Sequence, residues 1–196
     1  MKNGRHSGES SIAVYLALGS NLGDRAANLR EAVERIRKLV LELSRISSIY
    51  ETEPVGFAKQ EWFLNQVISA DISAFQFHNR EEQITDQAIS LLSKLQEIES
   101  EMGRERNITN GPRNIDIDLL LFGDSIIGYS RDATRQALST AKIVVPHPRM
   151  HERRFVLEPL CEIAPAVVHP VLNKTCEQML ASLADDSVVR LYGRNE

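Results

Sequence analysis

The stretch "GPRNIDIDLLLFGD", residues 111–124, joins two carboxylates to an almost wholly apolar run. Successive side chains of a β-strand point to opposite faces of the sheet. One face would therefore carry Asp116, Asp118 and Leu120, and the other Ile115, Ile117, Leu119 and Leu121. This pattern predicts a strand that enters a core, with both carboxylates side by side where burial begins.

The segments on either side of this strand alternate between strand and helix patterns. The predicted strands cover residues 12–20, 43–52 and 63–73, and the predicted helices cover residues 24–40 and 84–102. Asp24 is a candidate N-cap of the first helix, and Gly103 follows the second. The order strand, helix, strand, strand, helix, strand predicts an α+β, ferredoxin-like fold with a largely antiparallel sheet. Helices pack on this sheet, and C-terminal additions include a helix near residues 174–183.

The composition favours a single domain. Of the 196 residues, we expect residues 1–11 to be a disordered leader and residues 12–196 to form a single domain. A net charge of −4 gives no general field for nucleic acid, and no apolar run is long enough to cross a membrane. Cys161 and Cys176 lack the spacing of a zinc site or a disulfide framework. We therefore predict a cytoplasmic protein with reduced cysteines.

The acidic pair is a candidate metal site. Two residues apart on a strand, the Cα atoms of Asp116 and Asp118 would lie about 6.6 Å from each other. Hard carboxylate oxygens suit Mg²⁺, which completes its coordination with water and substrate phosphates. The alternative is that the pair forms the solvated face of an amphipathic strand. Leu120 on the same face favours the metal site, because two unpaired carboxylates at the border of a core repel each other.

Arginines surround the acidic pair in the sequence. Arg104, Arg106 and Arg113 precede it and Arg153 follows it, and guanidinium groups bind phosphate oxygens well. The chain has neither a P-loop nor a G-x-G-x-x-G motif, so side chains and metal would have to hold a nucleotide. Gln96 and Glu99 share a face of the second predicted helix. They are either contacts to a nucleotide or exposed polar residues. His147 and His151 are weak evidence for a metal site. The pattern is typical of a Mg-bound polyphosphate.

Five separated motifs resemble one enzyme family. They read "YLALGSNLGDR", "YETEPVG", "FLNQV", "GPRNIDIDLLLFG" and "VPHPRMHERRFVLEPL", and they extend over residues 12–165. In this order they resemble 6-hydroxymethyl-7,8-dihydropterin pyrophosphokinase, which transfers pyrophosphate from ATP to a pterin alcohol in folate biosynthesis. Many members read R-W-G-P-R where this chain has "TNGPR" at residues 109–113, and residues 129–142 form a longer insertion than in compact members.

The resemblance implies a role for each matching residue. Asp116 and Asp118 would hold two Mg²⁺ ions and, with Arg104 and Arg113, form the catalytic set. ATP, the co-substrate, would contact Gln96, Glu99, Arg104, Arg106, Arg113, Ile143, Val144, His147 and Arg153. The pterin would contact Thr52, Val55, Phe63, Asn65 and Phe155. The alternatives are a ferredoxin-like module that binds a nucleotide or pterin without chemistry, and a Mg-dependent pyrophosphoryl transferase with another acceptor alcohol.

Overall fold

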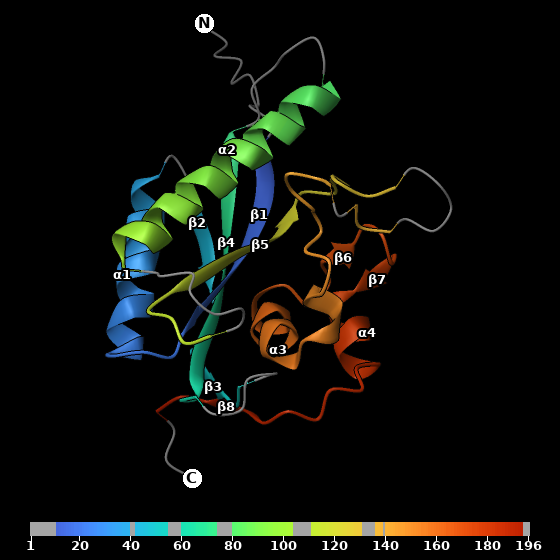
Figure 1. Ribbon diagram of the computed structural model, residues 1–196. Helices are drawn as coiled ribbons and strands as arrows, with labels where there is room; N and C mark the ends of the chain where they lie inside the picture. Colours follow the sequence, from blue (N-terminus) through green and yellow to red (C-terminus); the bar gives the residue numbers. More distant parts are fainter. Residues whose placement is uncertain are drawn as a thin grey trace, which may run out of the picture.

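A six-stranded antiparallel sheet forms the centre of the computed structural model (Figure 1), which describes residues 11–39, 42–54, 60–73, 80–103, 111–130, 136–138 and 140–193. Its strands are β1 (Ser11–Ser20), β2 (Glu42–Ile46), β3 (Tyr50–Thr52), β4 (Phe63–Ser73), β5 (Asp116–Phe122) and β8 (Val189–Leu191). Their order is β5-β1-β4-β3-β8, and β2 also pairs with β4. A separate hairpin consists of β6 (Val168–His169) and β7 (Lys174–Thr175).

Helices cover both faces of the sheet. On one face lie α1 (Arg25–Lys38) and α2 (Arg80–Glu101), and on the other lie α3 (Arg154–Ile163) and α4 (Cys176–Ala181) (Figure 1). Each face has its own apolar core. The first core packs β1 residues such as Leu16 against α1 and α2, and the second packs Val67, Leu120 and Leu121 against α3 and α4. The sheet is therefore the middle of three layers, and the C-terminal additions contribute α4 to the layer of α3 and β8 to the sheet.

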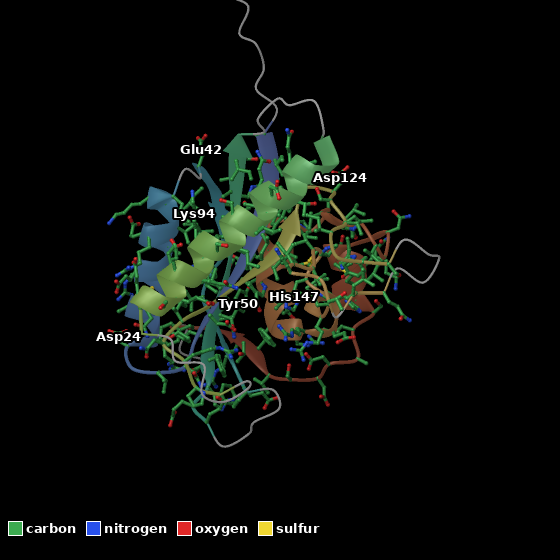
Figure 2. The ribbon with its side chains drawn as sticks, turned by 45° about the horizontal axis from the view of Figure 1, so that its top comes forward. Asp24, Glu42, Tyr50, Lys94, Asp124 and His147 are labelled. Carbon is green, nitrogen blue, oxygen red and sulfur yellow. The ribbon has the colours of Figure 1, made fainter. Side chains whose placement is uncertain are left out.

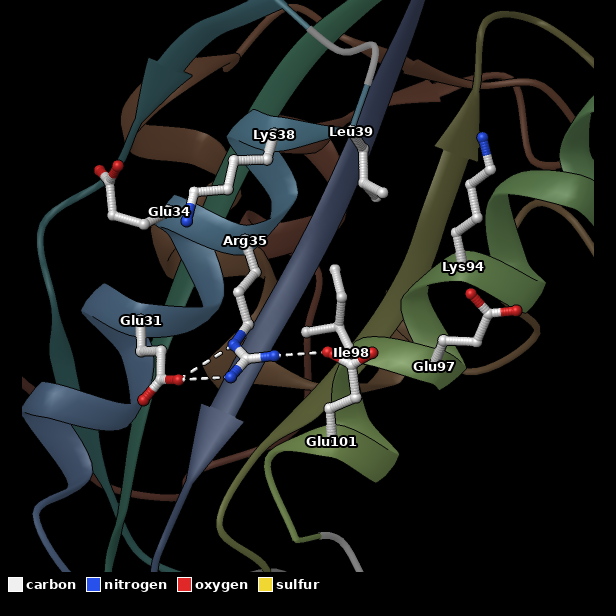
Figure 3. A pocket seen from close by; sticks show the side chains of 9 residues that line it. All are labelled: Glu31, Glu34, Arg35, Lys38, Leu39, Lys94, Glu97, Ile98 and Glu101. Atoms are coloured by element: carbon white, nitrogen blue, oxygen red, sulfur yellow. Dashed lines mark hydrogen bonds and ion pairs between the residues drawn. The ribbon is translucent and has the colours of Figure 1, made fainter.

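Helix α1 shows how local sequence sets an element. The Asp24 side chain accepts a hydrogen bond from the amide of Ala27 at 2.9 Å, which confirms Asp24 as the N-cap. Arg35, in the last turn, pairs with Glu31 one turn earlier and with Glu101 at the end of α2 (Figure 3). The basic last turn also complements the negative end of the helix dipole. The shallow groove between the two helices is lined by charged side chains, and Glu31 and Glu101 both pair with Arg35 across it.

The α+β, ferredoxin-like arrangement with C-terminal additions is confirmed, and two expectations about elements need correction. Residues 43–52 were expected as one strand, but the chain forms β2 and β3 with a break between them. At the break, the side-chain hydroxyl of Ser47, in place of a backbone carbonyl, accepts from the Val67 amide of β4. Helix α3 was not predicted at all. The expected leader lies outside the described residues apart from Ser11, which is the first residue of β1.

A β-bulge changes the predicted alternation along β5. Tyr15 pairs with Leu121 and Leu16 pairs with Leu119, so Leu120 is an extra residue in the ladder. Leu121 was expected on the face of Ile117, but it packs with Leu120 in the second core, while the following Phe122 lies in the first core. The bulge therefore turns two consecutive leucines toward α3, directly after the acidic pair.

The two cysteines lie together in the second core. Cys161 is on α3, Cys176 begins α4, and both are free thiols that interact with each other. The Sγ atom of Cys176 also donates to the carbonyl oxygen of Leu157 at 3.6 Å. Burial raises the pKa of both thiols, which keeps them protonated and weakly nucleophilic. Within the described residues, none of the helices is long and apolar enough to cross a membrane.

His169 should make the protein less stable in mild acid. Its side chain is 2% exposed, and burial together with the neighbouring His151 lowers its pKa to about 4. Above pH 6.5 the histidine is neutral in both the folded and unfolded states. As the pH falls below 6.5, only the unfolded state takes up the proton, so the free energy of unfolding decreases by about 2 kcal/mol between pH 6.5 and 5. No further loss from this group is expected below about pH 4.

Urea denaturation at pH 7.5 and pH 5 of the wild type and of His169→Phe measures this effect. Phe cannot titrate, so the variant should lose less stability than the wild type over this interval, whatever its stability at pH 7.5. His151, which faces His169 at 5.9 Å between ring centroids, and Lys174, its partner in the β6–β7 ladder, remain in both proteins. An equal loss of stability in both proteins would show that His169 does not cause it.

Candidate active site

The two carboxylates lie in nearby rows of paired residues across the sheet. Gly19 of β1 pairs with Asp116 of β5 on one side and with Asn65 of β4 on the other. Two pairs further along, Ala17 pairs with Asp118 and with Val67. Directly paired residues share a face of a sheet, and Val67 belongs to the second core. Asp116 and Asp118 therefore both lie on the face that carries α3.

Cationic and polar side chains from separate segments meet these carboxylates. The Nη2 atom of Arg113 lies 2.8 Å from Oδ2 of Asp116. The Nη1 atom of Arg153 and the Nε2 atom of His147 lie 3.5 and 3.9 Å from Oδ2 of Asp118. His147 is held beside β5 (Figure 2) by a hydrogen bond from its amide to the Leu120 carbonyl at 2.8 Å. Residues as far apart in the sequence as Arg113 and Arg153 are thus brought to one place.

Burial sets the protonation state of the His147 imidazole. Burial, together with the nearby Arg153 and Arg149, lowers the pKa of His147 to about 4, against a smaller opposing effect of Asp116. At neutral pH the imidazole is therefore uncharged and can donate one hydrogen bond without adding a charge. Burial also lowers the pKa of Arg153, but a guanidinium stays protonated at neutral pH. The charge opposite the carboxylates at neutral pH comes from Arg113 and Arg153.

Arg113 has an unused donor. Its Nε atom is buried and has no hydrogen-bond partner within the described part of the chain. Its guanidinium carbon lies 5.4 Å from the centroid of the Phe63 ring, so the aromatic face fixes the plane of the group. A buried donor without a partner costs free energy unless an acceptor arrives. The geometry fits an anionic ligand with several oxygens, such as a phosphate chain.

Aromatic rings and a fixed amide lie beside the carboxylates. The Nδ2 atom of Asn65 donates to Oγ1 of Thr52 at 2.7 Å, and both side chains are buried. Phe63 precedes Asn65 on the same face of β4, and Phe155 lies near Arg153, with 5.5 Å from guanidinium carbon to ring centroid. An oriented amide and two aromatic rings are the groups that bind a flat heterocycle.

The residues expected to contact the nucleotide differ in burial and in location. Glu99 is 2% exposed, and its Oε1 atom accepts a hydrogen bond from the amide of Ile117 at 2.7 Å, whereas Gln96 is exposed. Glu99 thus ties α2 to the open edge of β5 between the two aspartates. Ile143 is buried in the first core and Val144 is half-buried, in the segment that leads to His147. Arg104, Arg106 and Val55 lie outside the described residues.

Two further residues shape the site and were not assigned a role from the sequence. Asn21 is 1% exposed; its Oδ1 atom accepts from the Arg113 amide at 2.8 Å, and its Nδ2 atom donates to Gln60 and to the Glu61 carbonyl. It thereby holds the segments that precede β4 and β5. Gly19 lies in the row between Asp116 and Asn65, and Oδ1 of Asn65 lies only 2.9 Å from where a Cβ atom of Gly19 would be. The sequence signal that could have identified Gly19 and Asn21 is "LGSN", where a glycine and polar residues end an apolar strand.

The donor set suits a hard divalent cation that is shared with a ligand. Asp116 and Asp118 supply carboxylate oxygens on one face, with side chains 16% and 34% exposed. No group of three or more His, Cys, Asp or Glu side chains that could hold a metal ion occurs within the described ranges. The chain would therefore supply few ligands, and water and phosphate oxygens would supply the rest, as is usual for Mg²⁺.

Known proteins match this chain over most of its length. Residues 15–165 match the family model described as 7,8-dihydro-6-hydroxymethylpterin-pyrophosphokinase (HPPK). The 2-amino-4-hydroxy-6-hydroxymethyldihydropteridine pyrophosphokinase of Bacillus subtilis is 41% identical over 165 residues, covering 84% of this chain and 85% of that protein. The protein of the same name from Aquifex aeolicus is 37% identical, covering 84% of this chain and 88% of that protein.

Solved structures show the same fold. A crystal structure of Plasmodium falciparum HPPK-DHPS matches with a TM-score of 0.62 and 15% sequence identity, covering 90% of this chain. This chain spans 46% of the length of that chain. Identity this low supports a shared fold alone, whereas the family model and the relatives above carry the assignment. The chain belongs to the 7,8-dihydro-6-hydroxymethylpterin-pyrophosphokinase family.

Proposed function

We propose that this protein transfers a pyrophosphoryl group from ATP to 6-hydroxymethyl-7,8-dihydropterin, giving the pterin diphosphate and AMP, in folate biosynthesis. Membership of the HPPK family and the names of its relatives support this activity. The observation that carries the proposal is the position of the acidic pair. Asp116 and Asp118 lie beside two cations that suit a phosphate chain, and these cations contact aromatic rings that, with the Asn65 amide, suit a pterin.

In the proposed reaction, Asp116 and Asp118 would hold two Mg²⁺ ions. The bound metal would neutralise phosphate charge and help to align the triphosphate. Arg113 would donate its unused Nε–H to a phosphate oxygen, and Arg153 and neutral His147 would add donors from the other side. The chain's own contribution is positioning and charge stabilisation, and the reaction needs no covalent nucleophile.

The acceptor would lie over the row formed by Asp116, Gly19 and Asn65. The Asn65 amide, held by Thr52, would fix the polar edge of the pterin, and Phe63 and Phe155 would contact its faces. This pose would bring the pterin hydroxyl oxygen to the β-phosphorus. The oxygen forms a bond to phosphorus as the bond to the AMP oxygen breaks, and the hydroxyl proton is released.

The remaining assignments complete the proposed ATP site. Gln96, Ile143 and Val144 would contact the nucleoside, and Arg104 and Arg106 would contact phosphates. Val55 would contribute to the pterin site. Glu99 would act by fixing the backbone between the aspartates, because its carboxylate already accepts from Ile117. The proposed location is the cytoplasm, where ATP is available as co-substrate.

Product analysis tests the proposal. Purified protein is incubated with Mg-ATP and 6-hydroxymethyl-7,8-dihydropterin, and nucleotides are separated by chromatography. We expect AMP in equal amount to pterin diphosphate, and no AMP when either the pterin or Mg²⁺ is omitted. ADP as product would refute pyrophosphoryl transfer. Tight calorimetric binding of both ligands without AMP would identify a binding module, and AMP formation only with another alcohol would identify a different acceptor.

A further inference from the structure

The chain leaves α4 and runs back across the molecule to add β8 beside β3 (Figure 1). Residues 184–191, the C-terminal strap, contact two separate elements on the way. Near its start the strap binds the beginning of α3, and at its end it pairs with β3. These two elements carry residues from opposite sides of the proposed pterin site.

The first contact replaces a missing helix cap. The N-cap position of α3 is Arg153, whose side chain makes no capping hydrogen bond. Instead, Oδ2 of Asp185 accepts from the amide of Arg154 at 2.8 Å, and the Asp185 carbonyl accepts from Nε of Arg154 at 2.8 Å. Burial opposes ionisation of Asp185, yet the hydrogen bonds from Arg154 and Ser187 hold its pKa below the ordinary value. An ionised carboxylate at a helix N-terminus also favours the helix dipole.

The second contact fixes the other wall. The Val188 amide donates to Oε1 of Glu53 at 3.0 Å, and the Glu53 amide donates to the Val188 carbonyl at 3.3 Å. Val189 then pairs with Thr52, whose hydroxyl holds the Asn65 amide. The strap therefore connects the backbone next to Thr52 with the backbone between Arg153 and Phe155.

We propose that Asp185 is a positioning residue for the acceptor site. It acts through Arg154, whose neighbours Arg153 and Phe155 face the carboxylates and the proposed pterin. The strap sets the distance of Arg153 and Phe155 from the wall formed by Thr52 and Asn65. This inference rests on the proposed function. Without Asp185 the first turn of α3 loses its cap, so Arg153 and Phe155 no longer share one fixed orientation, and small displacements at a reacting site reduce rates strongly.

A second anchor of α3 offers a matched control. Near the opposite end of the helix, Glu162 accepts hydrogen bonds from the amide and hydroxyl of Ser48 and from the Tyr50 hydroxyl. Asp185 thus attaches α3 to the C-terminal strap, and Glu162 attaches the same helix to Ser48 and Tyr50 at the start of β3. Loss of either anchor should lower the melting temperature, by about 5 °C. Only Asp185 lies at the end of the helix that carries the proposed site residues, so only its loss should affect that site.

Steady-state kinetics of Asp185→Ala, Asp185→Asn and Glu162→Ala test the inference. Asp185→Ala should raise the KM for the pterin about tenfold, while Asp185→Asn, whose amide oxygen can still accept from Arg154, should stay within threefold of the wild type. Glu162→Ala should lose thermal stability with the pterin KM unchanged. An unchanged KM in Asp185→Ala, an equal rise in Asp185→Asn, or an equal rise in Glu162→Ala would each overturn the positioning role.

Hydrogen exchange without ligands separates this inference from the proposed function. The Arg154 amide should exchange at least about tenfold faster in Asp185→Ala than in the wild type, because it loses its acceptor. If the wild type forms no AMP, the proposed function fails even where this exchange result holds. If the wild type forms AMP and Arg154 exchange is the same in the variant, the strap inference fails alone.

Discussion

Replacing Asp118 by Asn is expected to lower kcat at least about a thousandfold while the fold is retained. Asn has the shape of Asp but lacks the charge, so a bound Mg²⁺ and the phosphate chain lose one anionic ligand. Asp118 is 34% exposed, and its ion pair with Arg153 contributes less than about 1 kcal/mol to stability. The measurement is AMP formation at saturating ATP and pterin, with circular dichroism and thermal melting to verify the fold.

Asp124→Asn is the control for this substitution. Asp124 is an exposed acid just beyond the end of β5, so its replacement removes one charge from the same part of the sequence without touching the site. Its kcat should match that of the wild type. The Mg²⁺ concentration that gives half-maximal rate should rise in Asp118→Asn and not in Asp124→Asn. A kcat within tenfold of the wild type in Asp118→Asn would remove this carboxylate from the catalytic set.

Gly19→Ala is expected to raise the KM for the pterin at least about tenfold, equivalent to about 1.4 kcal/mol of binding free energy. A Cβ atom at Gly19 would lie 2.9 Å from Oδ1 of Asn65 and 3.9 Å from the Phe63 ring. Asn65 is buried and bonded to Thr52, so its amide must turn and give up that bond to make room. The proposed contact between this amide and the pterin would then be misaligned, whereas the KM for ATP should change less than threefold.

Ala13→Gly controls for altered flexibility of β1. Ala13 lies toward the other end of the strand, opposite Asp71, and its replacement changes backbone freedom by a similar amount without creating a close contact. Kinetics with varied pterin should give an unchanged KM in this variant. A KM within twofold of the wild type in Gly19→Ala would mean that the row from Asp116 to Asn65 is not where the acceptor binds.

The sequence predicted the parts of the site that depend on local periodicity. Alternation along β5 placed Asp116 and Asp118 on one face, and the structure confirms this because the bulge begins only at Leu120. The meeting of Arg113, His147 and Arg153 at these carboxylates depends on how distant segments pack, which no local pattern reveals. The family resemblance brought these residues together before the geometry did.

The errors come from contacts between segments far apart in the sequence. Helix α3 contains Pro159 and has no side-chain cap of its own, so its sequence lacks the usual helix signals, and its cap comes from Asp185 far along the chain. The orientation of Leu121 was wrong because a bulge depends on the register of the neighbouring strand. Glu99 looked like an exposed polar residue or a ligand contact, but the edge of β5 lies against it and offers the Ile117 amide.

The division of the apolar interior by the sheet has a consequence for how such a protein can adapt. Substitutions beneath α1 and α2, at Leu29 or Leu95 for example, alter the core that faces away from Asp116 and Asp118. Substitutions at Leu120 or Leu157 alter the core that supports α3 and hence Arg153. Away from Gln96, Glu99 and Ile143, thermal tolerance can therefore be adjusted on one side of the sheet at little cost to turnover, whereas changes on the other side alter both together.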